Sequence, residues 1–262
     1  ETAAARALVA GLPGGEADYL DALRAYADRV YGGLFESSGE ATLLLDKTPA
    51  YALSLDFLAK LYPEAKYIVL TRHPIAVWSS FVDSFFDGDD PVAHEHNPLL
   101  ERYVPAIARF IREEKVPFHR VRYENLVQEP EGSARQLCDF LGIDFDPEMV
   151  DYGQAKDAKG ESTRGLGDPT TVAKQSRPTT DSLSKWAKAA TGRPERVALY
   201  QEIVARLADE DLETWGFSRA EIVRELAAID LEGAKAPRAK LTRYALERRG
   251  LVGIRRRIQP EN

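Results

Sequence analysis

The stretch KYIVLTRHPIAVWSS, residues 66–80, joins an apolar run to a helix-forming segment through a single arginine. The run KYIVLT, residues 66–71, has the composition of a buried strand. Pro74 fits the first turn of a helix, so we expect a helix from Pro74 to about Phe86. A strand that leads directly into a helix is the repeating unit of α/β proteins with a parallel sheet.

The segments on either side continue this alternation. We expect ATLLLD (41–46) to be a second buried strand and FHRVRYENL (118–126) a third, running into a turn. The helical period and end signals predict helices at 16–31 (closed by Gly32-Gly33), 54–61, 99–115, 130–141, 194–207 and 218–229. The polar segments 88–98 and 153–182 have loop composition. Such units place ligands at the carboxyl ends of the strands.

Composition restricts the class of protein. The 262 residues are 44% hydrophobic and 29% charged, which suits one sizeable α/β domain or a domain with appendages. No apolar run is long enough to cross a bilayer, and the N-terminus lacks the pattern of a signal peptide. A single cysteine, Cys138, excludes an intramolecular disulfide framework, and nothing in the sequence requires a metal. We therefore expect a cytoplasmic protein.

Charge is distributed unevenly along the chain. Residues 231–262 contain nine Lys/Arg and three Glu, a net of +6, whereas the whole chain carries -7 and the other 230 residues therefore carry -13. We divide the chain accordingly into a core, residues 1–230, and a basic helical tail, residues 231–262. Such a tail could dock on a nucleic acid, a membrane surface or an acidic partner, or be a solvated helix.

Two cations stand at expected strand ends. Arg72 follows the strand at 66–71 and precedes a helix N-terminus, which is a favourable place for an anion. Ser80 can face the same side as Arg72, whereas Ser79 would point roughly 100° away. Lys47 follows the expected strand at 41–46 and could stabilise charge on a transferring group. The alternative is that Arg72 extends to solvent from a sheet edge and that Lys47 lies in an exposed turn.

These residues resemble those of the PAPS-dependent sulfotransferases, where PAPS is 3'-phosphoadenosine-5'-phosphosulfate. The likeness rests on DKTPAY (46–51), on YIVLTRHP (67–74) with a serine eight residues after the arginine, and on YENLV (123–127). The phrase GLGDP (165–169), followed by Trp186, is similar to the sulfotransferase domains of bacterial olefin synthases and of the curacin polyketide synthase. The matching segment runs from about residue 41 to 190.

The resemblance implies an α/β fold of the P-loop-NTPase-like type, with three layers and a central parallel sheet flanked by helices. It also implies that Arg72 and Ser80 hold the 3'-phosphate, that Tyr123 borders the nucleotide and that Lys47 stabilises the bridging oxygen of the sulfuryl group. The loop that would close over the nucleotide comprises Arg164, Gly165, Leu166 and Gly167.

The chain departs from the family pattern in two places. The loop that cradles the 5'-phosphosulfate, with a pattern such as P-R-S-G-[ST]-T, is missing, so we expect a core that lacks its N-terminal phosphosulfate segment. In the olefin-synthase relatives a histidine follows GDP by a few residues, and Lys174 stands at about that place here. A protonated lysine is a poor base, and His94 or His96 could replace it.

The sequence therefore predicts a sulfotransferase that transfers a sulfuryl group from PAPS to a hydroxyl and releases adenosine 3',5'-bisphosphate. The acceptor is expected to be a small molecule or a β-hydroxyacyl chain on an acyl carrier protein, with no nucleic acid partner. The alternative is a catalytically inactive module that binds a 3'-phosphonucleotide or serves as a scaffold. A phosphotransferase is disfavoured because the G-x-x-x-x-G-K-[ST] motif is absent.

Overall fold

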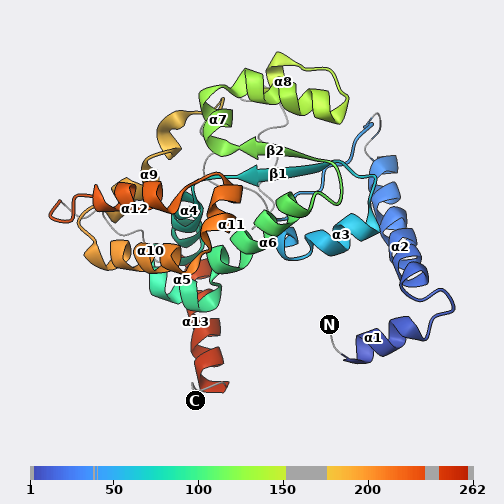
Figure 1. Cartoon of the computed structure of the whole chain (residues 1–262), viewed down its shortest axis with the longest axis horizontal. Helices are drawn as coiled ribbons and strands as arrows, with labels where there is room; N and C mark the ends of the chain where they lie inside the picture. The colour runs from blue at the N-terminus through green and yellow to red at the C-terminus, as the bar shows by residue number, and fades with distance from the viewer. Residues whose placement is uncertain (1–2, 38, 40, 152–175, 234–241, 259–262) are drawn as a thin grey trace. The chain divides into compact units, whose positions relative to one another are not determined.

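The computed structural model describes residues 3–37, 39, 41–151, 176–233 and 242–258 (Figure 1). The chain divides into two compact units. The N-terminal unit comprises Glu1–Ala65 with Glu113–Pro117, and the C-terminal unit comprises Lys66–Arg112 with Phe118–Asn262. Each unit is described by itself below.

Helices make up the regular structure of the N-terminal unit. They are α1 (Ala3–Ala10), α2 (Glu16–Ser37), the 3₁₀ helix η1 (Pro49–Leu53) and α3 (Leu55–Leu61). Polar contacts tie α2 to α3: Arg24 Nε donates to the Leu61 carbonyl at 2.8 Å, and Lys60 pairs with Glu16 at 2.8 Å. The predicted end of α2 at Gly32-Gly33 is wrong, because the helix continues to Ser37. A glycine inside a helix costs only about 1 kcal/mol, so long helices tolerate it.

The strand predicted at residues 41–46 is not formed. These residues are irregular, and Leu43, Leu44 and Leu45 are all exposed. A strand exists only where a neighbouring backbone accepts and donates its ladder of hydrogen bonds. Among the described residues the two strands pair with each other, so the segment 41–46 has no partner strand. The apolar composition of residues 41–46 therefore did not predict their conformation.

The C-terminal unit contains a parallel two-stranded sheet with helices around it. Strand β1 (Tyr67–Thr71) pairs with β2 (Phe118–Arg122) in a register that runs from Tyr67↔Phe118 to Thr71↔Arg122. Both strands were predicted. The helices are α4 (Pro74–Phe86), α5 (Asp90–His96), α6 (Leu99–Glu113), α7 (Tyr123–Gln128), α8 (Pro130–Leu141), α9 (Lys185–Ala190), α10 (Pro194–Arg206), α11 (Asp209–Trp215), α12 (Arg219–Ala227) and α13 (Arg243–Ile258), with short 3₁₀ helices η2 (Pro147–Met149) and η4 (Thr180–Ser182).

Helices cover both faces of this sheet (Figure 1). The Phe118 ring lies 5.8 Å from Phe110 of α6, and the adjacent His119 stacks on Phe140 of α8 at 5.5 Å. Because successive side chains of a strand point to opposite faces, α6 and α8 contact opposite sides of the sheet. The protein is thus a mostly helical α/β structure with a small parallel sheet.

Several helix ends follow their sequence signals, and one helix was missed. Gly142 ends α8 with a φ of 71°, and Ser218 with Glu221 forms the predicted capping box of α12. The segment 88–98, predicted to be a loop, contains α5 instead. The Asp89 side chain accepts the Val92 N–H at 3.3 Å and thereby caps this helix. Pro105 lies inside α6 without splitting it.

Helix α4 is the centre of the core of the C-terminal unit. Ile75, Trp78, Val82 and Phe86 of this helix are completely buried. They pack in one cluster with apolar side chains of α6, α10, α11 and α12. Residues at this spacing line one side of a helix, so the sequence of α4 fixes which side faces the core.

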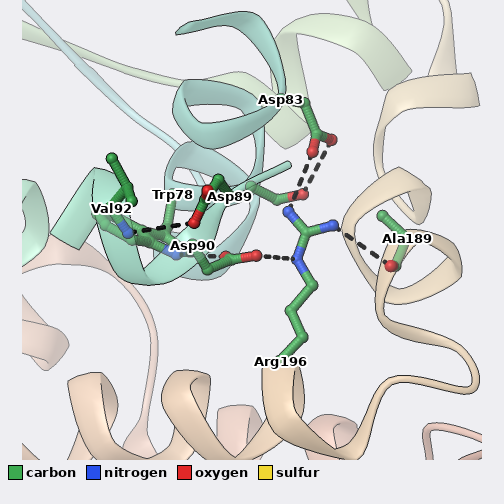
Figure 2. Close-up of polar contacts among 8 residues, drawn as sticks. Trp78, Asp83, Asp89, Asp90, Val92, Ala189 and Arg196 are labelled. Carbon is green, nitrogen blue, oxygen red and sulfur yellow. Dashed lines mark hydrogen bonds and ion pairs between the residues drawn. The ribbon is translucent and has the colours of Figure 1, made fainter. Parts of the chain in front are cut away.

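Arg196 of α10 connects the core helices through buried charges (Figure 2). Its Nη2 atom lies 3.1 Å from Asp83 of α4, its Nε atom lies 2.9 Å from Asp90 of α5, and Nη1 donates to the Ala189 carbonyl at 3.3 Å. The indole N–H of Trp78 donates to Asp90 at 3.0 Å. Burial raises the pKa of Asp90 to about 6 although Arg196 and Trp78 favour its charged form.

Candidate functional site

The carboxyl ends of β1 and β2 bring Arg72 and Tyr123 together. The centre of the Arg72 guanidinium lies 4.3 Å from the centre of the Tyr123 ring. Ser182 of η4 joins both residues: its carbonyl accepts a hydrogen bond from Arg72 Nη2 at 3.0 Å, and its hydroxyl lies 2.6 Å from the Tyr123 hydroxyl. A half-buried arginine that lies over an aromatic ring and is hydrogen-bonded to a backbone carbonyl has a restricted orientation.

The backbone around Arg72 is held from two other elements. The indole N–H of Trp215, in α11, donates to the Arg72 carbonyl at 2.7 Å. The backbone N–H of His73 donates to the Glu124 carboxylate, at the start of α7, at 2.8 Å. The His73 ring is buried and stacks on Trp186 at 4.7 Å. These contacts fix the direction in which the Arg72 side chain leaves β1.

Two arginines of β2, Arg120 in the middle of the strand and Arg122 at its end, add positive charge. Arg122 lies over the Phe217 ring at 4.8 Å. Burial lowers the pKa of Arg120, and the charge of Arg122 lowers it further. Arg120 Nε and Nη2 and Arg122 Nε are buried without a hydrogen-bond partner among the described residues. The carboxyl edge of the sheet thus carries the guanidinium groups of Arg72 and Arg122, with the Glu124 carboxylate nearby.

The two serines of α4 differ in exposure. Ser79 is buried and its hydroxyl lies 3.5 Å from Asp83, whereas Ser80 is exposed. Ser80 forms no hydrogen bond to Arg72 among the contacts of the described chain. Its exposed hydroxyl can donate a hydrogen bond to a molecule in solution.

Lys47 belongs to the N-terminal unit, where it is exposed beside Asp46. Asp46 accepts hydrogen bonds from the hydroxyls of Tyr31 at 2.5 Å and Tyr51 at 2.7 Å. The bond from Tyr31 lowers the pKa of Asp46, and the same bond raises that of Tyr31. The backbone that carries Lys47 is thereby attached to α2 through a carboxylate that remains charged at neutral pH.

The candidate bases lie in other surroundings. His94 Nε2 lies 2.6 Å from Glu101, and its ring meets that of Trp78 edge to face at 5.7 Å. His96 lies 5.3 Å from the Phe86 ring, and burial lowers its pKa, as do the charges of Arg248 and Arg255. None of these contacts reaches Arg72, Tyr123 or Ser182. Lys174 and the residues Arg164, Gly165, Leu166 and Gly167 lie outside the described residues.

Sequence reasoning missed three residues of this site. Ser182 lies at the end of a segment read only as loop, and no local pattern marks it. Glu124 and Trp215 act through a backbone N–H and a backbone carbonyl, so their roles depend on the tertiary fold. No group of three or more His, Cys, Asp and Glu side chains is arranged to hold a metal ion in the described part of the chain.

Comparison with known proteins identifies the family. The profile of the Sulfotransferase family matches residues 10–147, which is just over half of the chain. The chain belongs to the sulfotransferase family. The matched region contains β1, α4 and β2. Arg72, Ser80 and Tyr123 therefore all lie within the segment that matches the family profile.

The curated relatives are distant and longer than this chain. The nodulation protein NoeE of Sinorhizobium fredii is 28% identical over 180 residues, which cover 59% of this chain and 41% of that protein. Omega-hydroxy-beta-dihydromenaquinone-9 sulfotransferase Stf3 of Mycobacterium bovis is 30% identical over 117 residues, which cover 38% of this chain and 29% of the relative. This sulfotransferase chain thus spans less than half the length of either relative.

A solved sulfotransferase structure was also found. It is the sulfotransferase domain from the curacin biosynthetic pathway, with 21% identity and a TM-score of 0.41. The superposition covers 86% of this chain and 67% of that domain. No helix in the described part of this sulfotransferase is long and apolar enough to cross a membrane.

Proposed function

We propose that this sulfotransferase uses PAPS as the sulfuryl donor and that Arg72, Ser80 and Tyr123 bind its 3'-phosphoadenosine part. The observation that supports this most is the Arg72 guanidinium, which lies 4.3 Å from the centre of the Tyr123 ring at the carboxyl end of β1. A planar guanidinium with free donors matches the oxygens of a phosphate. The exposed hydroxyl of Ser80, from the helix that follows β1, adds a second donor.

The proposed reaction is an in-line displacement at sulfur. A hydroxyl oxygen of the acceptor forms the new S–O bond while the bond to the bridging phosphate oxygen breaks, and adenosine 3',5'-bisphosphate leaves. The acceptor proton passes to a base, for which His94, His96 and Lys174 are the candidates. Lys47 stabilises the negative charge that develops on the bridging oxygen, and Arg164, Gly165, Leu166 and Gly167 close over the nucleotide. Such a transfer depends on positioning and charge stabilisation.

The proposal also covers the fold, the domain division, the acceptor and the location of the protein. We infer a P-loop-like three-layer fold, with residues 1–230 as the catalytic core and 231–262 as a tail. The acceptor is a hydroxyl of a small molecule or of a chain on an acyl carrier protein, and the protein works in the cytoplasm. The second candidate is an inactive module that binds a 3'-phosphonucleotide, because the sequence lacks the phosphosulfate loop pattern.

Calorimetric titration of the chain tests the donor site. We expect adenosine 3',5'-bisphosphate to bind at least about tenfold more tightly than adenosine 5'-monophosphate, because a hydrogen bond to a charged group contributes about 1.5–3 kcal/mol. Equal affinities, or no binding of either nucleotide, would contradict the proposal. Release of adenosine 3',5'-bisphosphate from PAPS then separates an enzyme, which releases it, from a module, which retains the donor intact.

Ser80 offers a test with an adjacent control. Ser80→Ala should weaken adenosine 3',5'-bisphosphate about tenfold and leave adenosine 5'-monophosphate unchanged, since it removes one hydroxyl donor to the 3'-phosphate. Ser79→Ala removes a hydroxyl from the buried side of the same turn and should alter neither affinity by more than about twofold. Calorimetry on both variants measures this. The assignment of Ser80 fails if Ser79→Ala weakens adenosine 3',5'-bisphosphate and Ser80→Ala does not.

A further inference from the structure

Helix α13 is attached to the C-terminal unit by one side only. Ala245 and Val252 are 0% and 3% exposed. Arg249 pairs with Asp89 at 2.7 Å, and the backbone N–H of Thr242, just before the helix, donates to Asp87 at 2.6 Å. The Arg248 guanidinium lies 5.2 Å from the Phe85 ring. This side is therefore specifically packed on the ends of α4 and the start of α5.

The other side of α13 exposes a row of large apolar side chains. Leu246, Leu251, Ile254 and Ile258 are 52%, 56%, 54% and 74% exposed. Three of them, with Gly250, follow at intervals of four residues, so each lies about 40° further round the helix than the one before and the row winds across the exposed side. The row extends for about 18 Å at 1.5 Å per residue. The C-terminal part of α13 projects beyond α5 (Figure 1).

The same helix is strongly basic. It contains six arginines and one glutamate, while the chain as a whole carries -7. Arg243 has a side chain that is 94% exposed, and Arg257 is also exposed, as is Arg255, whose Nη1 donates to the His96 carbonyl at 3.3 Å. Glu247, the one acidic residue, pairs with Arg243 at 3.0 Å. A surface that covers the apolar row would have to be negatively charged.

We propose that the exposed face of α13 docks on an anionic lipid surface. An apolar row with arginines beside it is the pattern of helices that lie in the plane of a membrane interface, where side chains enter the acyl boundary and arginines contact phosphates. A second copy of the helix would bring its own excess of arginines and be repelled. A nucleic acid would gain nothing from four exposed Leu and Ile side chains. This inference does not depend on the nucleotide site.

Vesicle co-sedimentation of the full chain tests the proposal at low salt. We expect binding to vesicles of phosphatidylcholine and phosphatidylglycerol in equal parts, weak binding to phosphatidylcholine alone, and release as salt is raised. The double variants Leu251→Ser with Ile254→Ser, and Arg255→Gln with Arg257→Gln, should each weaken binding about tenfold or more. Val223→Ser, which removes an apolar side chain 44% exposed on α12, is the matched control and should bind as before.

Three outcomes would overturn the proposal. The first is that the unaltered chain does not bind the anionic vesicles. The second is that binding persists in both double variants or falls equally in Val223→Ser. The third is that the chain ignores vesicles and instead self-associates in a way that Leu251→Ser with Ile254→Ser abolishes, which would make the face an interface between copies. Thermal unfolding midpoints check that the variants are folded, and all substituted side chains are exposed.

Discussion

Arg72→Ala should reduce the affinity for adenosine 3',5'-bisphosphate about 100-fold and that for adenosine 5'-monophosphate by no more than about threefold. The variant removes the guanidinium that we propose contacts the 3'-phosphate, and each hydrogen bond to a charged group contributes about 1.5–3 kcal/mol. Adenosine 5'-monophosphate lacks that phosphate and so loses little. Calorimetric titration of both nucleotides measures the two affinities.

Two further variants make this result specific. Arg72→Lys retains the charge but loses the planar guanidinium. Its affinity for adenosine 3',5'-bisphosphate should therefore lie between that of the unaltered chain and that of Arg72→Ala. Arg135→Ala is the matched control, since Arg135 also lies over an aromatic ring, that of Phe145 at 4.0 Å, but on α8. It should bind both nucleotides normally. Equal losses of the two nucleotides in Arg72→Ala would remove Arg72 from the 3'-phosphate site.

Arg196→Met should lower the free energy of unfolding by about 3–5 kcal/mol, because it leaves Asp83 and Asp90 without their cation. The side chain of Arg196 is 3% exposed and that of Asp90 is 7% exposed, so water cannot replace the lost interaction. In a chain of this size such a loss lowers the thermal midpoint by about 10 °C. Thermal unfolding followed by circular dichroism measures the shift.

A second arginine, Arg112, shows how much of the expected loss of stability depends on burial of the ion pair. Arg112 contacts two carboxylates, Glu210 at 3.3 Å and Asp211 at 2.8 Å, but its side chain is 33% exposed. Arg112→Met should therefore cost no more than about 1 kcal/mol. Adding Asp90→Asn to Arg196→Met should recover part of the loss, because the unpaired buried charge is removed. Equal costs for the two arginines would contradict the role given to burial.

The pH dependence follows from the raised pKa of Asp90. Its folded value of about 6 lies above its ordinary value of 3.8, so the folded protein holds this proton more tightly than the unfolded chain. The contribution of Asp90 to stability is greatest below the ordinary pKa and falls as pH rises through the folded pKa. Arg196→Met removes the cation that favours the charged form and raises this pKa further. The difference in midpoint between Arg196→Met and the unaltered chain should therefore be smaller at pH 5 than at pH 7.

The sequence predicts the parts of the fold that depend on local chemistry. The strand at 66–71, the helix from Pro74, the end of α8 at Gly142 and the capping box of α12 all follow from residues within one or two turns. The strand at 41–46 and the loop at 88–98 were wrong for different reasons. The first depends on a partner strand, which local composition does not reveal. The loop prediction at 88–98 rested on polar composition, and it missed that the Asp89 side chain caps α5.

The candidate site divides in the same way. Arg72, Ser80 and Tyr123 could be found because each stands at a strand end or on a helix turn whose position the sequence predicts. Ser182 could not, since its link to Arg72 joins residues that are far apart in the chain. The buried charges around Arg196 were also missed, because sequence periodicity shows that a residue is helical and not which carboxylate it meets.

The parallel register of β1 and β2 has a consequence for the order of folding. Tyr67 pairs with Phe118, and closing a loop of about 50 residues costs about 3–4 kcal/mol of chain entropy before any contact offsets it. The helices between the strands form from local contacts, whereas the sheet and the Arg72–Tyr123 pair arise only after this closure. During synthesis the contacts among Arg72, Tyr123 and Ser182 therefore form late, after η4 has emerged.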